Sequence, residues 1–261
     1  MSDGREAQPA FTDLCAWTGH WAGLPPEAGQ VDLLGALGRE GVARVCLSPL
    51  DGLWALNPHL ANSALYRMAG EHPRVYPVPL LDPGVPTWRA ELERARQVPR
   101  LRLVRLAPAY GGYDLLEADG LLRALAETGL GAAVQVRVED PRRQHPLAQV
   151  PDVPVAAVVE SARRHPDVPV VLAGAVARGV EEALPALGEL PRFYADIAQV
   201  DGMDSVRRLV DAGAGCRLLW ASHAPLFMPQ AAVARVLADL NDTEAWALLA
   251  GNARDLLGDP D

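Results

Sequence analysis

The chain has 261 residues, and with 49% hydrophobic and 22% charged residues it has the composition of an ordinary globular protein. Its net charge of −9 and the lack of a basic stripe argue against nucleic acid as a partner. No apolar run reaches the roughly 18 residues of a membrane helix, and the polar start MSDGREAQPA predicts a cytoplasmic protein with no membrane partner.

Short β-like runs alternate with helix-like segments along the whole chain. The predicted strands are 11–16, 43–48, 75–80, 101–107, 132–138, 169–173, 193–197 and 216–221. The predicted helices are 30–39, 58–71, 86–97, 115–128, 153–165, 177–188, 203–213, 229–239 and a last one near 243–257. Most of the strands are rich in valine and leucine, as strands of a buried parallel sheet are.

Eight alternations of strand and helix predict one (β/α)8 barrel domain over residues 1–261, since such a barrel takes about 250 residues. Gly41, Gly129 and Gly213 each follow a helical pattern, as a helix C-cap does. A doubly wound open sheet is the alternative fold. Its first strand usually runs into a glycine-rich phosphate turn, and segment 17–21 is not such a turn.

The fifth predicted strand carries polar side chains on one face. Because strand side chains alternate, Gln135, Arg137 and Glu139 share a face opposite three valines. A face of this kind does not suit a dry helix layer, so we expect it at the barrel mouth, where barrel enzymes have their active sites. The alternative is a buried ion-pair network that only holds the top of the barrel together.

An anion site is predicted next to this face. Arg105 shares a face of the fourth strand with Leu101 and Leu103. Together, Arg105 and Arg137 would suit a carboxylate or a phosphate, which a guanidinium binds bidentately. Tyr110 lies in the loop that follows, so the expected substrate-binding residues are Arg105, Arg137, Gln135, Tyr110 and Trp17. An equally good alternative pairs the arginines internally, with Asp13, Glu139 or Asp196.

The first and last strands supply the expected catalytic groups. Asp13, Cys15 and Trp17 share one face of the first strand, and His223 follows the last strand. A histidine suits proton transfer because its reference pKa of about 6.5 lies near neutral pH. We therefore expect His223, Asp13 and Glu139 to be catalytic. Trp17, with Trp21 and Trp54, walls a pocket or packs in the core.

The basic residues are all arginine, so chemistry that depends on lysine is excluded. A Schiff-base aldolase, a pyridoxal-phosphate enzyme and a dinuclear metal centre bridged by a carboxylated lysine each need a lysine. The three cysteines, Cys15, Cys46 and Cys216, lie in apolar runs without close spacing. They predict buried free thiols rather than disulfides or a zinc knuckle.

The chain resembles the amidohydrolase-related family of metal-dependent (β/α)8 hydrolases over nearly its whole length. The family's end motif is matched by GNARDLLG at 251–258, and its Ser-Asp-x-Pro motif by Ser222, His223, Ala224 and Pro225. The family's Asp-x-His-x-His strand retains Asp13, but Cys15 and Trp17 stand in place of the histidines. Segment 171–174 has no histidine, and Gln135 or Arg137 stands in the region of the strand 5 histidine.

The resemblance implies a hydrolase, or a related lyase, that acts on a small anionic or amide-bearing metabolite. The alternative is a non-catalytic descendant that binds such a metabolite or a protein partner. We expect no metal cofactor. If a divalent metal such as zinc binds, Cys15, His223 and Asp13 are its candidate ligands. Self-association into a homo-oligomer stays open.

Overall fold

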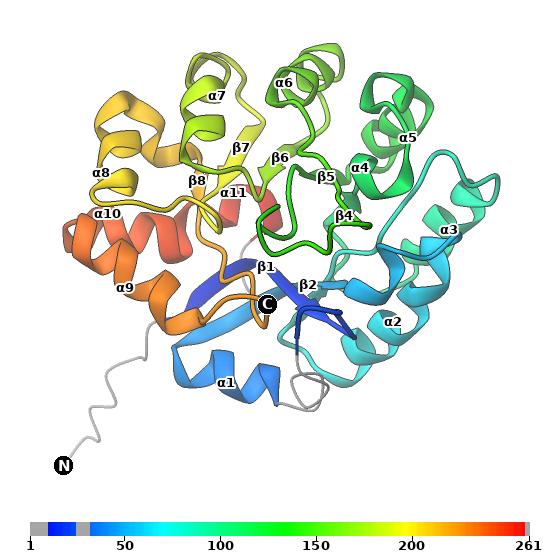
Figure 1. Cartoon of the computed structure of the whole chain (residues 1–261), viewed down its shortest axis with the longest axis horizontal. Helices are drawn as coiled ribbons and strands as arrows, with labels where there is room; N and C mark the ends of the chain where they lie inside the picture. The colour runs from blue at the N-terminus through cyan, green and yellow to red at the C-terminus, as the bar shows by residue number, and fades with distance from the viewer. Residues whose placement is uncertain (1–9, 25–31, 259–261) are drawn as a thin grey trace.

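The strands form a closed barrel in the computed structural model, which describes residues 10–24 and 32–258. Helices form an outer ring around the parallel strands (Figure 1). The strands are β1 Phe11–Thr18, β2 Val42–Pro49, β3 Val75–Pro77, β4 Leu103–Leu106, β5 Gly131–Gln135, β6 Val170–Ala173, β7 Phe193–Asp196 and β8 Leu218–Leu219. The predicted (β/α)8 barrel is confirmed.

Backbone hydrogen bonds run around the whole barrel. Parallel pairing joins β1, β2 and β3 in one sheet and β4 to β8 in the other. The chain after β3 meets β4 where Arg105 N donates to Pro79 O at 2.8 Å and Leu81 N donates to Arg105 O at 3.0 Å. Leu14 N donates to Trp220 O at 3.1 Å and so closes β8 onto β1.

The α-helices follow the predicted segments, with several short turns between them. They are α1 Leu33–Arg39, α2 Asn62–Glu71, α3 Trp88–Ala95, α4 Pro108–Gly111, α5 Asp119–Thr128, α6 Val155–Arg164, α7 Ala177–Glu189, α8 Ser205–Leu209, α9 Pro229–Asp239, α10 Asp242–Trp246 and α11 Arg254–Leu257. The single 3₁₀ or π turns are η2 Leu50–Gly52, η3 Pro58–Ala61, η4 Leu115–Glu117, η5 Val210–Ala214, η6 Gly215–Arg217 and η7 Ala247–Gly251.

Local sequence explains how several of these helices begin and end. Asn241 and Glu244 form a reciprocal capping box at the start of α10. Gly129 ends α5 with a φ of 70°, a left-handed conformation that glycine adopts at little cost. Residues 30 and 31 of the first predicted helix lie outside the described residues. None of the helices within 10–24 and 32–258 has the length and apolar character needed to cross a bilayer.

Alternation along the strands divides the core into two layers. Val104, Val134 and Leu172 are buried between the barrel wall and the helices. Cys15 and Trp17 point towards the barrel axis and are also buried. The axial layer therefore contains the polar and sulfur-bearing residues that the sequence singles out.

Several predicted strands have other bounds in the structure, and two of these differences affect predicted residues. The sequence predicts a strand over 132–138, whereas β5 ends at Gln135 and the chain then turns inward across the barrel mouth (Figure 1). Cys216, predicted to lie buried in a strand over 216–221, is exposed in the turn η6 that precedes the two-residue β8. Both errors arise because apolar composition does not reveal where a tight turn replaces strand pairing.

Candidate functional site

The barrel mouth is filled by backbone from the loop after β5. Residues 137–139, called the plug here, place two carbonyl groups over the ends of the strands. The carbonyl of Val138 accepts from His223 Nε2 at 2.7 Å and from Gln199 Nε2 at 3.2 Å. The carbonyl of Arg137 accepts from Gln135 Nε2 at 2.5 Å and from Gln199 Nε2 at 3.1 Å. Side chains from three strand ends thus hold a peptide segment where an open pocket was expected.

Gly174 makes room for the plug at the end of β6. Its φ is 67°, and a Cβ built on it would lie 2.4 Å from both Arg137 O and Gln135 Nε2. Any side chain here would displace the plug. The absence of a histidine at this strand therefore has a steric reason, since the backbone of residue 137 occupies the space.

His223 is fully buried, and both of its ring nitrogens are occupied. Because a carbonyl can only accept, Nε2 carries the proton, and Nδ1 then accepts from Trp17 Nε1 at 3.3 Å, with Cys15 Sγ 3.6 Å away. The ring of Phe227 packs over the imidazole at a centroid distance of 5.0 Å. Burial, together with the positive charge of Arg105, lowers the pKa of His223 to about 4, although the hydrogen bond to Val138 opposes this shift.

Asp13 ties the first strand to the loop after β8. Its carboxylate accepts from Ser222 Oγ at 2.5 Å, Ser222 N at 2.9 Å and Cys15 N at 3.1 Å. Burial raises the pKa of Asp13, and these hydrogen bonds oppose the rise. Burial likewise raises the pKa of the Cys15 thiol to about 12, so at neutral pH it is a thiol rather than a thiolate.

Arg105 is enclosed in the barrel interior. Its Nε donates to Ser48 Oγ at 2.8 Å, its Nη1 donates to Gln135 Oε1, and its guanidinium lies 4.6 Å from the Trp17 ring. Its Nη2 is buried without a hydrogen-bond partner among the described residues. Asp196 accepts instead from the backbone of Gly174 and Ala198, and burial raises its pKa to about 6.

The predicted anion pair of Arg105 and Arg137 does not form. Arg137 points away from the interior and binds Asp152 bidentately, with Nε–Oδ1 at 2.8 Å and Nη2–Oδ2 at 2.6 Å. This hydrogen bonding raises the pKa of Arg137. The two side chains separate because β5 ends before residue 137, so the alternation on which the prediction rested no longer holds.

The side chains of Glu139 and Tyr110 lie near Trp21, at the rim of the mouth. Glu139 accepts from Trp21 Nε1 at 3.2 Å, which joins the loop after β1 to the loop after β5. Tyr110 packs edge-on against Trp21 and Trp54, with ring centroids 6.1 Å and 5.2 Å apart. The structure therefore groups Asp13, Cys15, Trp17, Arg105, Gln135 and His223 in the interior and places the other predicted residues outside it.

A divalent metal, which the family resemblance implies, does not suit the residues present. The three candidate ligands are already engaged. His223 uses both nitrogens, Asp13 accepts three hydrogen bonds, and Cys15 is held as a thiol. Zinc needs three or four free donors converging on one point. In the described part of the chain, no group of three or more His, Cys, Asp or Glu side chains could hold a metal ion.

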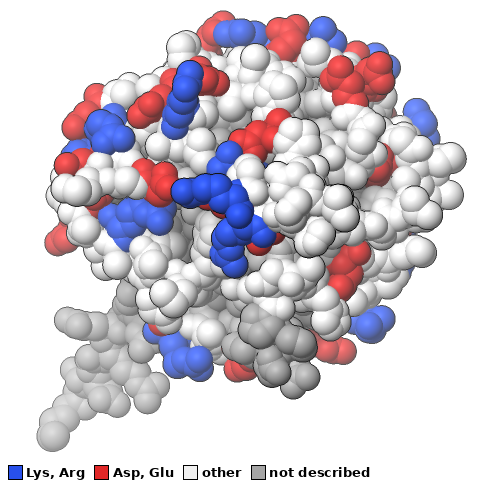
Figure 2. Space-filling model, in the orientation of Figure 1, with Lys and Arg blue, Asp and Glu red and all other residues white. Residues whose placement is uncertain are grey.

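Beside the plug lies an open groove at the carboxyl ends of β5 to β8. Its volume is about 430 Å³, which is in the range of small-molecule sites. Figure 2 shows basic side chains gathered near the centre of this face, with acidic ones beside them. The charged lining residues are Arg137, Asp140, Arg143, Asp201 and Arg235, and the apolar wall includes Leu226, Phe227, Met228 and Ala232.

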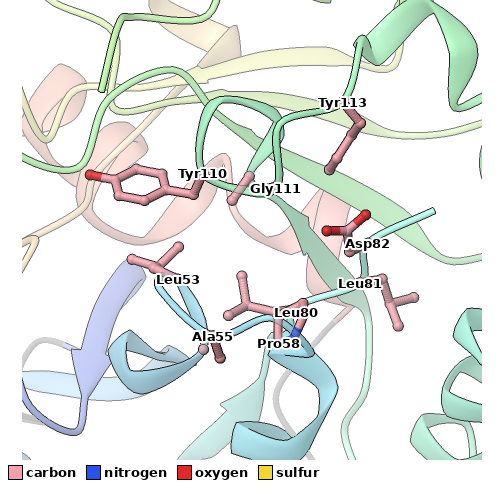
Figure 3. Close-up of a pocket in the computed structure, with 11 residues that line it drawn as sticks. Leu53, Ala55, Pro58, Leu80, Leu81, Asp82, Tyr110, Gly111 and Tyr113 are labelled. Carbon is pink, nitrogen blue, oxygen red and sulfur yellow. The ribbon is translucent and has the colours of Figure 1, made fainter. Parts of the chain in front are cut away.

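A second cavity near the mouth is too small for a metabolite. It lies between Leu53, Leu80, Asp82 and Tyr110, and at about 20 Å³ it has room for little more than one water molecule (Figure 3). The groove is therefore the better candidate for a ligand site at this end of the barrel.

Four residues that matter here were not identified from the sequence. Gln199 donates a hydrogen bond to the plug, and Ser222 lines the groove and donates to Asp13. Arg143 and Arg235 line the groove. Ser222 was noted as part of a motif and could have been assigned a role from it. Nothing in the local pattern marks the two arginines, because they come from a loop and a helix that only the fold brings together.

Comparison with known proteins identifies relatives of the chain. The amidohydrolase family model matches residues 25–258. No curated protein sequence matches the chain.

Solved structures with the same fold share little sequence with it. A provisionally named 2-pyrone-4,6-dicarboxylic acid hydrolase from Pseudomonas putida has a TM-score of 0.69 and 21% identity, with 97% of this chain and 98% of that chain covered. A dihydroxybenzoic acid decarboxylase from Polaromonas sp. JS666, solved with manganese, has a TM-score of 0.69 and 13% identity, with coverages of 95% and 96%. A 5-carboxyvanillate decarboxylase from Sphingomonas paucimobilis has a TM-score of 0.62 and 15% identity, with coverages of 89% and 85%.

The lowered pKa of His223 makes stability depend on pH. The unfolded chain, with a histidine pKa near 6.5, binds more protons than the folded chain between pH 6.5 and about 4. The contribution of the neutral ring is therefore complete above pH 6.5 and is lost as the pH falls to 4, by on the order of 3 kcal/mol. Asp196 has the opposite slope, because its folded pKa is raised.

Denaturant unfolding at several pH values checks this. The free energy of unfolding of the wild type minus that of His223→Gln should decrease as the pH is lowered from 6.5 to 4. Taking the difference removes the contribution of Asp196, which both proteins share. His145→Gln, at an exposed histidine, is the matched control. A difference that stays constant with pH would mean that His223 is not a buried neutral base.

Thiol labelling tests whether the plug stays closed. In the native protein we expect one fast-reacting thiol, Cys216, which is exposed. Cys15 and Cys46 are buried with raised pKa values and should react only on unfolding. Mass spectrometry of the labelled peptides after timed exposure to a disulfide reagent identifies each cysteine. Fast labelling of Cys15 under native conditions would show that the mouth opens.

Proposed function

The chain belongs to the amidohydrolase family, and from that premise we propose that it binds a small planar carboxylate in the groove at the barrel mouth. The groove carries the proposal because it lies at the strand ends where barrel proteins bind their ligands. It is also large enough for a single-ring compound, at about 430 Å³. The plug restricts such a ligand to the side of the mouth over β5 to β8.

The charges that line the groove suit an anion. Arg137 and Asp140 are already paired, with Asp152 and Arg142 respectively. Arg143 is half exposed, and its one ion pair within the described part of the chain is a long one to Glu139, with Nε–Oε1 at 3.8 Å. Its guanidinium is therefore free to bind a carboxylate bidentately.

The other wall of the groove is apolar and suits a flat ring. Phe227 and Leu226 supply a face against which an aromatic ring can pack. The solved relatives support this class of ligand by name, since dihydroxybenzoic acid, 5-carboxyvanillate and 2-pyrone-4,6-dicarboxylic acid are all ring carboxylates. Those names describe the relatives, and the ligand of this chain is the proposal.

Thermal-shift titration with ring carboxylates tests the proposal. A ligand at 100 times its dissociation constant should stabilise the native state by about 2.7 kcal/mol. We expect benzoate derivatives to shift the melting temperature, and neutral benzamide not to do so.

Two variants locate the binding site. Arg143→Gln should weaken binding about tenfold or more, because a charge-assisted hydrogen bond is lost. Arg163→Gln removes the same charge from α6, away from the groove, and should bind as the wild type does. Equal weakening in both variants, or no hits among the ring carboxylates, would refute the groove as the site.

Turnover of the bound compound, by hydrolysis or a lyase reaction, is the second candidate. Ser222 lines the groove, and its hydroxyl donates to the buried carboxylate of Asp13 at 2.5 Å. A carboxyl group with a raised pKa directly below a ligand site is suited to proton transfer. His223 lies in the same cluster but donates to the plug, so its catalytic role requires the plug to move.

Product analysis with the ring carboxylates that bind tests this candidate. If Ser222 and Asp13 move a proton, Ser222→Ala should lower turnover on the order of a hundredfold while ligand affinity stays within about twofold. His223→Asn shows whether the histidine also participates. Binding without any turnover would leave the chain a ligand-binding member of its family.

A further inference from the structure

A second basic pocket lies at the opposite end of the barrel from the groove. Its volume is about 380 Å³, and its walls come from the segments that lead into β4 and β5. It therefore lies at the amino ends of the strands. Its lining includes Arg96, Arg100 and Arg102, with Val98, Leu101 and Leu130 as apolar neighbours.

The pocket has an excess of positive charge. Its lining within residues 10–24 and 32–258 contains no aspartate or glutamate. Arg96 is paired with Glu93 at 2.9 Å, whereas Arg100 and Arg102 have no carboxylate within 4.0 Å among the described residues. Two arginines without a carboxylate partner thus line the pocket, in a chain whose net charge is −9.

Backbone carbonyl groups hold these two arginines in place. Arg100 Nε donates to Val75 O at 3.0 Å, and its Nη2 donates to His72 O at 3.2 Å and to Ala69 O at the end of α2. Arg102 Nε donates to Leu257 O at 3.1 Å. A carbonyl orients a guanidinium but does not neutralise it, so the charges are fixed in position and remain available to a ligand.

Capping of the helices that end at the pocket does not account for the arginines. At the end of α5, Thr128 Oγ1, Gly129 N and Leu130 N donate to the carbonyls of Ala124, Leu125 and Ala126. At the end of α3, Arg96 N and Val98 N do the same. Among the described residues, none of the three guanidinium groups donates to a carbonyl of α3 or α5, whereas Arg100 does donate to the end of α2.

We propose that this pocket binds a phosphate group. A phosphate carries about −1.5 to −2 charges at neutral pH, which matches the two uncompensated guanidinium groups. Arginine also binds phosphate oxygens bidentately. The apolar neighbours Val98, Leu101 and Leu130 suit a small organic group attached to the phosphate. The site is separate from the groove and does not depend on the function proposed for it.

Isothermal titration calorimetry with inorganic phosphate and with phenyl phosphate tests this, at ionic strength held constant with potassium chloride. We expect both to bind the wild type, and Arg102→Gln and Arg100→Gln each to weaken binding about tenfold or more. Arg102 is exposed, so Arg102→Gln keeps the test valid if Arg100→Gln, which also removes hydrogen bonds to the end of α2, does not fold. Arg163→Gln is the matched control for loss of one positive charge.

The outcomes separate this site from the groove and from weak ion binding. Tighter binding of phenyl phosphate would assign the ligand as a phosphorylated metabolite, and equal binding would assign free phosphate. Both results support the proposal when Arg143→Gln binds phosphate normally. No phosphate binding, equal weakening in Arg163→Gln, or weakening in Arg143→Gln alone would overturn it.

Discussion

The hydrogen bond from His223 Nε2 to the carbonyl of Val138, 2.7 Å long, is the constraint on which the barrel mouth depends. It joins the loop after β8 to the loop after β5 directly above the strand ends. Gln135 and Gln199 donate hydrogen bonds to the neighbouring carbonyl, that of Arg137. Gly174 has no side chain and so leaves the space that the plug occupies. Because a buried carbonyl needs a donor, these side chains stabilise the plug in its place over the strand ends.

This constraint gives one physical reason for several departures from the family pattern. An imidazole that donates to a backbone carbonyl and accepts from an indole has no nitrogen left for a metal. Trp17 stands where the family pattern has a histidine, and its ring lies against the guanidinium of Arg105. The polar groups of the interior thus hydrogen-bond to one another and to the plug. This network closes the barrel axis and leaves the groove beside the plug as the open volume of about 430 Å³.

Arginine provides the positive charge at both ends of the barrel, and its partners decide what each residue can do. Arg137 is matched to Asp152 and has little capacity for another anion. Arg105 is buried among neutral and aromatic groups. Among the described residues, Arg143 at the groove has only a weak ion pair, and Arg100 and Arg102 at the opposite pocket have none. Since every basic residue of the chain is arginine, residue type alone does not distinguish these roles.

The sequence by itself determined the barrel, because eight apolar runs separated by amphipathic segments leave few other ways to bury both layers. Strand order and side-chain parity also placed Asp13, Arg105, Gln135 and His223 at one end of the axis, but they wrongly placed Arg137 in the same group. Only the tertiary structure decided that this cluster is closed. The end of β5 at Gln135 depends on contacts with Gln199 and His223, which are more than 60 residues away, and no local pattern encodes them. The groove and the basic pocket at the opposite end of the barrel likewise arise from loops and helix ends that meet only after the barrel closes.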